Sequence, residues 1–485
     1  MKKSDVVVVG SGLGSLTAAV LLAKKGLKVQ IIEQNWQPGG CTSSYWRKGY
    51  VFESGATTLV GLSDGMPLQY VLNEIGLTLK TRKLELPMQV HLKNGQVISR
   101  FEDLDQWILE AERVFGSANQ RSFWEECFQI SEFVWKNSLK QLSFPPRKLS
   151  DVAQALKSLS IDQLRNFKNA FISMEELLKK HQLFANEPFK EFVNEQLLIT
   201  AQNHMHEVNA LFGATALCYT NYPNHYLDGG LLSLVNPLID YVKSTGGDIV
   251  YREGVNQINP AGGGYLVSTA QNEYQTNYVI SGIPINNTLE IFEKADLARI
   301  KSKVMDSKQL NSAFQLGIGF EPHRKFESIH HQIHLSEPLP EVGSDSIFIS
   351  LSHPEDHSRT DISGHAVMSV STHLADPANH FIESERAEKA IIDFLIEHDF
   401  LKNENIHLIH SSSPKSWVKW TGRKWGFVGG YPQFMKVKPW QMLDARLDGH
   451  KAYQVGDTVY PGQGIPGVTL SGIIAVEKMK LDWGI

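Results

Sequence analysis

Glycines and one acidic residue near the start of the chain have the spacing of a phosphate-binding site. Gly10 and Gly12 follow a four-valine strand, and a helix is predicted from Ser15 to Lys25. Gly10 permits a tight turn, Gly12 lets the backbone approach a pyrophosphate, and the N–H groups at the helix start face its charge. Glu33 ends the next predicted strand, where its carboxylate can accept both hydroxyls of a ribose. The pattern predicts a dinucleotide site.

The elements that must position these residues form a strand–helix–strand unit over residues 5–33, with Gly26 as the C-cap of the helix. The third small position of the glycine fingerprint holds Ser15, with Gly14 beside it. Serine is small enough for the helix to pack on the strand, so this is a mild departure. A lone glycine turn says little about a ligand, but the strand, helix and terminal glutamate together favour one.

Two further segments favour FAD over a nicotinamide dinucleotide. Residues 38–58 offer two more glycine turns, where a plain nicotinamide domain would continue into another helix. Far along the chain, Gly456 and Asp457 follow a predicted strand and offer an acceptor for a ribityl hydroxyl. The helix that starts near Gly464 points its positive end toward the pyrimidine edge of a flavin. Three separate segments agree on FAD.

The middle of the chain is predicted to return to the nucleotide domain. An apolar helical stripe follows Asp228, and Pro237 inside it suggests that the regular helix begins near Ser233. A strand over 248–258 would put Val255 against the adenine. A second, buried strand is expected at 278–281, before Gly282. The nucleotide domain is therefore discontinuous.

The predicted fold class is α/β, with a Rossmann-like FAD-binding domain of the glutathione-reductase type and a mixed α+β substrate domain. The stretch from about 100 to 220 is largely helical and rich in aromatic residues, and it would form a cap or face a membrane. Short strands such as 346–351 and 366–370, with a helix at 384–397, would form the roof of a substrate cavity. The expected divisions are 1–90, 225–285 and 441–485 for the FAD-binding domain, 91–224 for the helical cap and 286–440 for the sheet-containing substrate domain.

Composition excludes several classes of protein. The 485 residues contain 42% hydrophobic and 20% charged residues, which is typical of a folded globular chain, and the net charge of −5 gives no support to nucleic-acid binding. Three cysteines without a CxxC pair, Cys41, Cys127 and Cys218, indicate reduced thiols and argue against a disulfide framework or a zinc site. No run is long enough to span a bilayer, so we expect a cytoplasmic protein, attached peripherally to a membrane. The loop 144–148 is either a solvated turn or a membrane contact.

Catalytic candidates are few. There is no Gly-x-Ser-x-Gly elbow and no HExxH motif, and no metal site is predicted. The remaining polar candidates are not expected to be catalytic. His204 and His206 would lie on a helix but point apart, and His330, His331 and His334 would lie at the surface. Asp356, His357 and Arg359 would lie in a loop that is either solvated or at a cavity mouth. A flavin could do much of the work itself. If the substrate is a long polyene, an allylic carbon can lose a hydride to flavin N5, and the second proton is then acidic enough for a weak base or water. No catalytic residue is assigned.

The chain resembles the phytoene-desaturase family of FAD-dependent carotenoid desaturases and isomerases, and within it the carotenoid 3,4-desaturase branch. The segments that carry the resemblance are Pro38-Gly39-Gly40-Cys41, Gly55-Ala56-Thr57 followed by Leu62, residues 197–202 and 213–217, Trp420-Thr421-Gly422-Arg423, residues 426–430 and residues 455–464. Three positions depart from the pattern. Glu53 replaces the usual Asp, Ser15 replaces a glycine, and Ile465-Pro466-Gly467 matches general desaturases and isomerases better than the branch.

The resemblance implies a flavoprotein that takes a hydrophobic C40-type polyene from a membrane surface and passes electrons from reduced FAD to a quinone or oxygen. It implies FAD contacts at Gly10, Ser11, Gly12, Leu13, Gly14, Glu33, Gln34, Gly39, Gly40, Cys41, Gly55, Ala56, Val255, Gly456, Asp457, Gly464 and Ile465. It also places Thr57, Thr58, Arg423, Gly429 and Gly430 near the isoalloxazine or the cavity roof.

The first hypothesis for function is carotenoid desaturation. The alternatives are a carotenoid cis/trans isomerase or a retinol-saturase-like polyene reductase with the same fold. A lipid-binding escort without redox chemistry is disfavoured, because such a protein has no need for carboxylates at both the ribose and the ribityl positions, where Glu33 and Asp457 are found.

Overall fold

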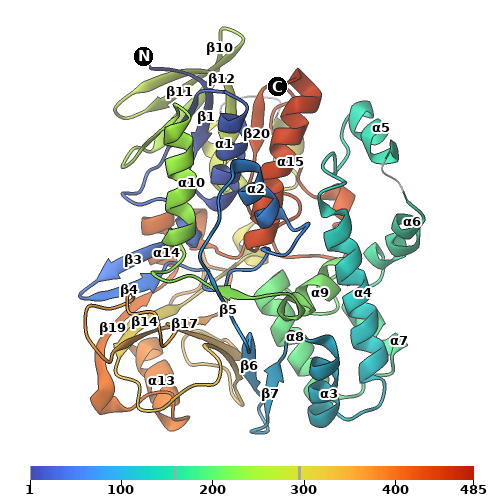
Figure 1. Cartoon of the computed structure of the whole chain (residues 1–485), viewed down its shortest axis with the longest axis vertical. Helices are drawn as coiled ribbons and strands as arrows, with labels where there is room; N and C mark the ends of the chain where they lie inside the picture. Colours follow the sequence, from blue (N-terminus) through green and yellow to red (C-terminus); the bar gives the residue numbers. More distant parts are fainter. Residues whose placement is uncertain (1, 158–159, 293–296) are drawn as a thin grey trace.

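The computed structural model describes residues 2–157, 160–292 and 297–485. Within these ranges the chain forms two seven-stranded sheets. In Figure 1 the first sheet and its helices fill the upper half, the second sheet lies at the lower left, and a group of helices lies at the lower right. Both termini lie beside the first sheet.

The first sheet is built from three distant parts of the chain. Its strands are β1 (Lys2–Val9), β2 (Val29–Ile32), β9 (Asp248–Val250), β10 (Val255–Ala261), β11 (Gly264–Thr269), β12 (Glu273–Ser281) and β20 (Ala452–Gln454). The order is β10-β11-β12-β1-β2-β9, and β20 pairs with β12. Because β1 pairs in parallel with both β2 and β12, the carboxyl ends of these strands meet at one edge. This edge is where a doubly wound sheet binds its ligand.

The single strand predicted over 248–258 is wrong. The structure has two strands there, and β9 and β10 lie at opposite edges of the sheet. Arg252 adopts a left-handed conformation with φ 57° between them. The N–H groups of Arg252 and Glu253 donate to the carbonyls of Asn35 and Glu33, so the turn is held against the end of β2. The buried strand expected before Gly282 is present as the end of β12.

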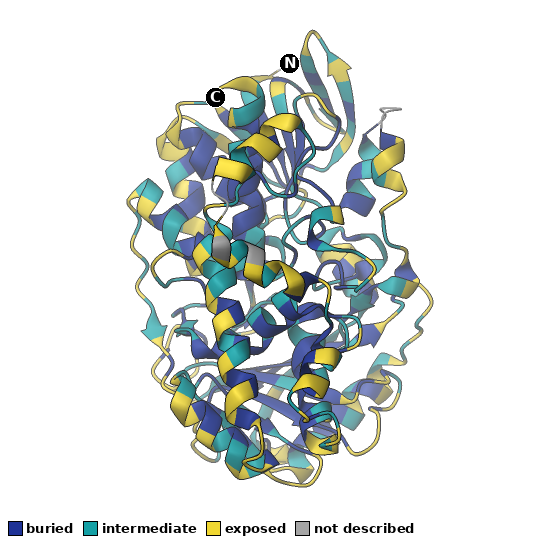
Figure 2. Ribbon diagram, turned by 90° about the vertical axis from the view of Figure 1, so that its right-hand side faces the viewer, coloured by how far each residue is buried: buried dark blue, intermediate teal, exposed yellow. Residues whose placement is uncertain are grey.

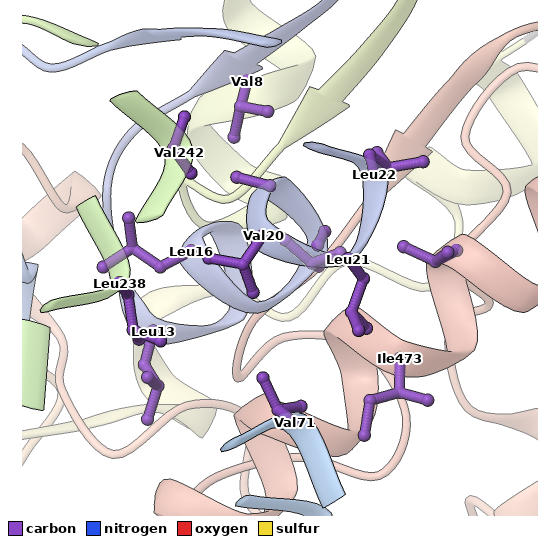
Figure 3. Packing of buried hydrophobic residues seen from close by; sticks show 14 of the residues in the cluster. Val8, Leu13, Leu16, Val20, Leu21, Leu22, Val71, Leu238, Val242 and Ile473 are labelled. Atoms are coloured by element: carbon purple, nitrogen blue, oxygen red, sulfur yellow. The ribbon is translucent and has the colours of Figure 1, made fainter. Parts of the chain in front are cut away.

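Four helices cover the first sheet: α1 (Leu13–Lys24), α2 (Pro67–Ile75), α10 (Leu232–Ser244) and α15 (Ile465–Trp483). Every residue of α1 from Leu13 to Ala23 is buried, because the other three helices surround it. Figure 3 shows Leu16 and Val20 of α1 beside Leu238 of α10. α10 begins at Leu232, one residue from the predicted start, and keeps Pro237 inside the helix.

The second sheet has the order β19-β14-β17-β16-β15-β6-β7. Its strands are β6 (Met88–His91), β7 (Val97–Arg100), β14 (Gln315–Phe320), β15 (His330–His334), β16 (Ser346–Leu351), β17 (Ala366–Thr372) and β19 (Ile406–Ser412). Helix α13 (Ser384–Glu397) adds Ala387, Ile391 and Leu395 to its core. The predicted boundary at residue 90 falls inside β6, and the division of the chain into three domains stays a prediction.

The prediction that His330, His331 and His334 lie at the surface is wrong. All five residues of β15 are buried, because this strand lies inside the sheet and both of its faces are covered. His330 contacts the Pro87 carbonyl at 3.1 Å and His331 contacts the Ser328 carbonyl at 2.9 Å, so these two imidazoles have buried hydrogen-bond partners.

The helical group has a core rich in aromatic side chains. Its helices are α3 (Leu104–Phe115), α4 (Gln120–Ser138), α5 (Leu149–Lys157), α6 (Ile161–Phe167), α7 (Met174–Lys180), α8 (Glu187–Ala201) and α9 (Ala210–Leu217). Trp107, Trp124 and Phe192 are fully buried, but Phe167 and Phe171 are half-exposed. Figure 2 shows many exposed positions along the outer helices. Among the described residues, no helix combines the length and the apolar character needed to cross a bilayer.

Two further expectations about polar residues need correction. His204 and His206 do not lie on a helix, because α8 ends at Ala201 and Gln202 turns left-handed; their rings stack 6.3 Å apart. The loop with Asp356, His357 and Arg359 is not simply solvated. His357 is exposed, but Arg359 is buried and donates to Glu53 at 2.9 Å, and Asp356 accepts from the Tyr226 hydroxyl.

The loop 144–148 is not simply a solvated turn, and its contact with a membrane stays a prediction. Arg147 donates to the carbonyls of Trp440 and Met442 at 2.9 and 2.6 Å, and Lys148 pairs with Asp482 at 2.7 Å. Nearby, the Arg446 guanidinium pairs with Asp151, which is fully buried. The loop therefore fixes the helical group to the end of α15.

A short hairpin connects the two halves of the molecule. It consists of β3 (Ser44–Arg47) and β4 (Tyr50–Glu53) and packs on the second sheet. A methyl group on Gly319 of β14 would lie 2.5 Å from the Tyr50 ring, and Gly317 lies in the same way under Phe52 and His410. Two glycines thus make a flat surface for the hairpin.

The remaining strands and α-helices are β5 (Arg82–Lys83), β8 (His225–Tyr226), α11 (Ile285–Ile291), α12 (Ala298–Lys301), β13 (Asn311–Ser312), β18 (Leu374–Ala375) and α14 (Pro414–Thr421).

Candidate active site

The first glycine turn leaves room for a pyrophosphate. Gly10 has φ 81°, which a side chain would disfavour, and Gly12 is the N-cap of α1. A methyl group on Gly12 would meet no atom within 4 Å, so open space lies before the helix start. Unpaired N–H groups and the positive end of α1 face this space. The residues present therefore fit a bound phosphate group.

Glu33 is buried at the end of β2 and held in one orientation. Its carboxylate accepts from the Ser11 N–H at 2.9 Å, the Ser11 hydroxyl at 2.6 Å and the Asn35 N–H at 2.7 Å. A carboxylate has about four acceptor positions, so capacity for a ribose hydroxyl remains. The neighbouring Gln34 side chain lies against Gly254 and Gly422.

The second and third glycine turns lie against the first. The Gly39 N–H donates to the Ser11 carbonyl at 3.1 Å, and Gly12 and Gly39 form a parallel bridge. The Ala56 N–H donates to the Cys41 carbonyl at 3.1 Å, which brings residues 55–58 to the same place. Val255, at the start of β10, packs against the apolar cluster that contains Val9 and Ile32 at the ends of β1 and β2.

The wall opposite α1 comes from the far end of the sequence. Gly456 follows β20 with φ 104°, and its N–H donates to the Ser471 hydroxyl of α15. A methyl group on Gly14 would lie 3.0 Å from the Gly456 nitrogen, so α1 and this turn touch backbone to backbone. Gly464 is the N-cap of α15 and Ile465 its first residue, as predicted.

The mild departure at Ser15 has a structural counterpart. Ser15 is buried, and its hydroxyl occupies the position that a methyl group on Gly282 would need. The extra atoms at the third fingerprint position are therefore matched by a glycine at the end of β12. Helix and sheet pack closely despite the substitution.

Arg423, Gly429, Gly430 and Asp457 meet at one point. Two Arg423 contacts of 2.9 and 3.1 Å join its guanidinium to the Asp457 carboxylate, and Arg423 also donates to the Phe427 carbonyl. A methyl group on Gly430 would lie 2.5 Å from the Asp457 carbonyl, and one on Gly429 would lie 2.6 Å from the Gln202 amide. The pair fixes the Asp457 carboxylate beside the glycine turns.

A cavity of about 950 Å³ begins at these turns. Cys41, Thr57, Thr58, Gly429 and Asp457 line one part of it. From there it is lined mainly by apolar side chains of the helical group and reaches Phe167 and Trp440 near the surface. Its size is at the upper end for ligand cavities. Thr58 also contacts the buried His330, Oγ1 to Nε2, at 3.1 Å.

His373 is a cavity residue that the sequence did not reveal. It follows β17, lines the cavity and lies 3.4 Å from the Gln202 amide nitrogen, Nε2 to Nε2. Burial lowers its pKa to about 4, partly offset by a hydrogen bond with the Leu198 backbone. Burial raises the pKa of two further cavity groups, Cys41 and Tyr460, the latter to about 12. At neutral pH His373 is therefore an uncharged imidazole that can accept a proton. No sequence signal beyond its place after a buried strand marks it.

The structure thus brings together the predicted residues of the three glycine-rich segments and of the end of β20. Their roles as FAD contacts stay predictions, as do those of Thr57, Thr58, Arg423, Gly429 and Gly430 around the flavin ring.

Sequence comparison supports the assignment of the cofactor. Residues 16–480 match the family described as flavin containing amine oxidoreductase. Prolycopene isomerase of Daucus carota is 22% identical over 100% of this chain and 81% of its own length, and that of Arabidopsis thaliana is 23% identical over 99% and 83%. All-trans-retinol 13,14-reductase of Danio rerio is 25% identical over 60% of this chain and 49% of its own length.

Solved structures show the same fold. Putrescine oxidase bound to putrescine superposes with a TM-score of 0.64 at 16% identity, covering 98% of this chain and 99% of its own. A fatty acid isomerase from P. acnes gives a TM-score of 0.60 at 14% identity, with 98% of both chains covered. The predicted Rossmann-like FAD-binding fold is confirmed.

The match over nearly the whole length agrees with the glycine turns, the buried Glu33 and the Arg423–Asp457 pair. These features are those of an enzyme that uses FAD. The chain belongs to the flavin containing amine oxidoreductase family and is an FAD-dependent oxidoreductase.

Proposed function

We propose that this protein desaturates a carotenoid-type polyene with bound FAD. The observation that carries the proposal is the cavity, which runs from the flavin-side turns to an apolar mouth between α5, α6 and the loop around Trp440. A cavity of this size with mainly apolar walls suits a polyene, because such a chain offers few polar groups for recognition. The whole-length similarity to prolycopene isomerases, whose name denotes a carotenoid, supports the same substrate class.

Desaturation removes one hydride and one proton from adjacent carbons, and a C=C bond forms between them. Bound FAD supplies the hydride acceptor. The apolar walls exclude water, and His373 takes the proton as a weak base, which suffices because a proton beside a delocalised cation is acidic. Gln202, within 3.4 Å, orients the ring. Quinone or oxygen as the final electron acceptor is proposed from the family resemblance.

Isomerisation is the second candidate, and the prolycopene isomerases favour it because they match along the whole chain. Reduction of a polyene is favoured by the shorter match to retinol 13,14-reductase. An isomerase leaves the product mass unchanged and needs no net proton acceptor, so the role of His373 separates the two reactions.

The test is expression in a carotenoid-producing host, followed by product mass and absorbance. Desaturation predicts a yellow protein, a product lighter by two hydrogens and an absorption shift to the red. Unchanged mass with activity only after dithionite reduction would instead establish isomerisation, and a heavier product would establish reduction.

A pair of histidine variants sharpens this test. His373→Asn should keep FAD and lower desaturation about 10²-fold or more, since general bases contribute about 10²–10⁴-fold. His357→Asn, at an exposed position, should match the wild type. Desaturation that survives His373→Asn at full rate would rule out this proton acceptor.

We also propose that the cavity mouth docks on a membrane surface. Exposed apolar side chains gather there: Leu149 (89% exposed), Leu156 (62%), Phe167 (53%) and Phe171 (48%). Phe167 stacks on Trp440, and Lys438 lies over the Phe171 ring. Apolar side chains with flanking cations are typical of surfaces that enter the lipid headgroup region.

Vesicle co-sedimentation tests the docking surface. The double variant Phe167→Ser and Phe171→Ser should bind less to anionic vesicles than the wild type. Phe381→Ser, which removes an aromatic that is more exposed (77%) and does not line the cavity, should bind as the wild type does. Equal loss in both would show that general hydrophobicity, and not this mouth, drives binding.

A further inference from the structure

We propose that Glu321, His365 and His407 bind a divalent transition-metal ion of the zinc class at the edge of the second sheet. The potential ligand atoms of the three side chains lie within 4.8 Å of one another. None of the three lines the cavity, so this site is separate from the flavin chemistry.

Three neighbouring strands place these residues. Glu321 directly follows β14, His365 directly precedes β17, and His407 is the second residue of β19. β14 lies between the other two strands, and its last residue, Phe320, is paired with both Ala366 and Ile406. The Glu321 N–H also donates to the Asn405 carbonyl at 3.0 Å. The positions of the three side chains are therefore set by sheet register and not by a mobile loop.

A buried tyrosine orients one of the ligands. The Tyr50 hydroxyl lies 2.6 Å from Nδ1 of His365 and leaves Nε2 of that ring for a metal. Tyr50 is only 2% exposed, and its ring is held over Gly319. Metal-binding histidines use their second nitrogen in this way, which fixes the tautomer and the ring direction. This contact is independent of the ligand cluster itself and points to the same ion.

The donor set selects the metal class. Two imidazole nitrogens and one carboxylate oxygen form a set found for zinc, with a fourth position open to water, whereas calcium and magnesium prefer oxygen ligands alone. The ring centroids of His365 and His407 lie 4.2 Å apart, so both imidazoles can reach one ion.

Small side-chain rotations complete the geometry. Tetrahedral bonds of about 2.0 Å require ligand atoms about 3.3 Å apart. Glu321 and His407 are exposed, so they can turn by this amount without disturbing the core. A bound ion would join β14, β17 and β19 and, through Tyr50, the hairpin β3–β4. Its effect is therefore to stabilise the contact between the two halves of the molecule.

Cobalt titration of the full-length, tag-free holoprotein tests the site. We expect one Co²⁺ per chain, with ligand-field absorption at wavelengths beyond the flavin bands, displaced by Zn²⁺ and accompanied by a higher melting temperature. His407→Ala should abolish the absorption, and Glu321→Gln should weaken binding at least tenfold. His357→Ala, an exposed histidine outside the cluster, should bind as the wild type does.

Tyr50→Phe keeps the ring over Gly319 and removes only the hydroxyl, so it should weaken Co²⁺ binding about 10- to 100-fold. Its metal-free melting temperature reports any effect on folding. Should Tyr50→Phe fail to fold, the exposed His407 variant decides alone. Absence of stoichiometric Co²⁺ in the wild type, or equal binding by His407→Ala, would overturn the proposal.

Discussion

The two seven-stranded sheets bury different kinds of side chain. In the first sheet, β1 and β2 bury valine and isoleucine, and the ligand-binding edge is formed by glycine turns. In the second sheet, β15 and β19 bury the four histidines His330, His331, His334 and His410. The first sheet is therefore sensitive to the size of a side chain, and the second is sensitive to the charge of a buried imidazole.

Burial keeps these imidazoles uncharged. It lowers the pKa of His330 and His410 to about 4, and those of His331 and His334 to about 3. The unfolded chain would have histidines near 6.5. Below pH 6.5 the unfolded state therefore binds more protons than the folded state, and stability falls as the pH falls.

The largest effect should follow from acidification. Each of these histidines should lower the free energy of unfolding by about 1.4 kcal/mol for each pH unit between 6.5 and its folded pKa. Urea unfolding at pH 7.5, 6.0 and 5.0 measures this slope. Hydrogen exchange at pH 5.0 should show peptides of β15 and β16 opening before those of β1 and β12.

Two variants separate the histidine effect from carboxylate titration. His334→Gln should reduce the slope, and His357→Asn should leave it unchanged. A free energy of unfolding that is constant from pH 6.5 to 5.0 would contradict the proposed difference between the sheets.

A smaller effect is expected from adding one methyl group to the first sheet's glycines. Gly14→Ala puts a carbon 3.0 Å from the Gly456 nitrogen and should cost about 1–3 kcal/mol of stability, with loss of flavin. Gly12→Ala faces open space, so the flavin-free protein should unfold as the wild type does while flavin content falls. Flavin absorbance and denaturant midpoints measure both. Equal loss of stability in the two variants would show that close contact with Gly456 is not the reason why position 14 requires a glycine.

Glu33→Gln tests the polar part of the same edge. It removes a charged acceptor from three donors and should weaken flavin binding about 10- to 100-fold, because hydrogen bonds to charged groups contribute about 1.5–3 kcal/mol. Flavin titration of the apoprotein checks this, with the exposed Glu385→Gln as the control. Unchanged flavin affinity would mean that Glu33 only holds the glycine turn in place and does not contribute to flavin binding.

The smallest effect is expected at Ser15. Its buried hydroxyl has no hydrogen-bond partner within the described part of the chain. Ser15→Ala should therefore be neutral or stabilise the protein by up to about 1 kcal/mol, with unchanged flavin content. A clear destabilisation in thermal unfolding would reveal a partner for this hydroxyl.

Local signals explain what the sequence could predict. The strand–glycine–helix unit and the start of α15 at Gly464 depend on neighbouring residues, and both are present. The split between β9 and β10 depends on which strands each one pairs with, so Arg252 gave no sign of it. His330 and its neighbours were missed because a polar strand reads as exposed unless both of its faces are known to be covered. Arg359 was missed because its partner Glu53 is 306 positions away.

The site could be predicted only in part for the same reason. Its cofactor residues form short motifs, whereas the environment of His373 is a cavity lined by many segments that are far apart in the sequence. Burial in that cavity lowers the pKa of the imidazole and keeps it uncharged, and the residue type alone does not show this.

The close contact between α1 and α15 has a consequence for biosynthesis. Gly472 of α15 approaches the Gly14 carbonyl so closely that a methyl group would lie 2.6 Å from it. During translation α1 emerges long before α15, so one wall of the pocket must wait for the rest of the chain. Until then the side of α1 that packs on α15 is left uncovered, even after α2 and α10 have formed. FAD can be captured firmly only after α15 has docked, which makes flavin incorporation a late marker of completed folding.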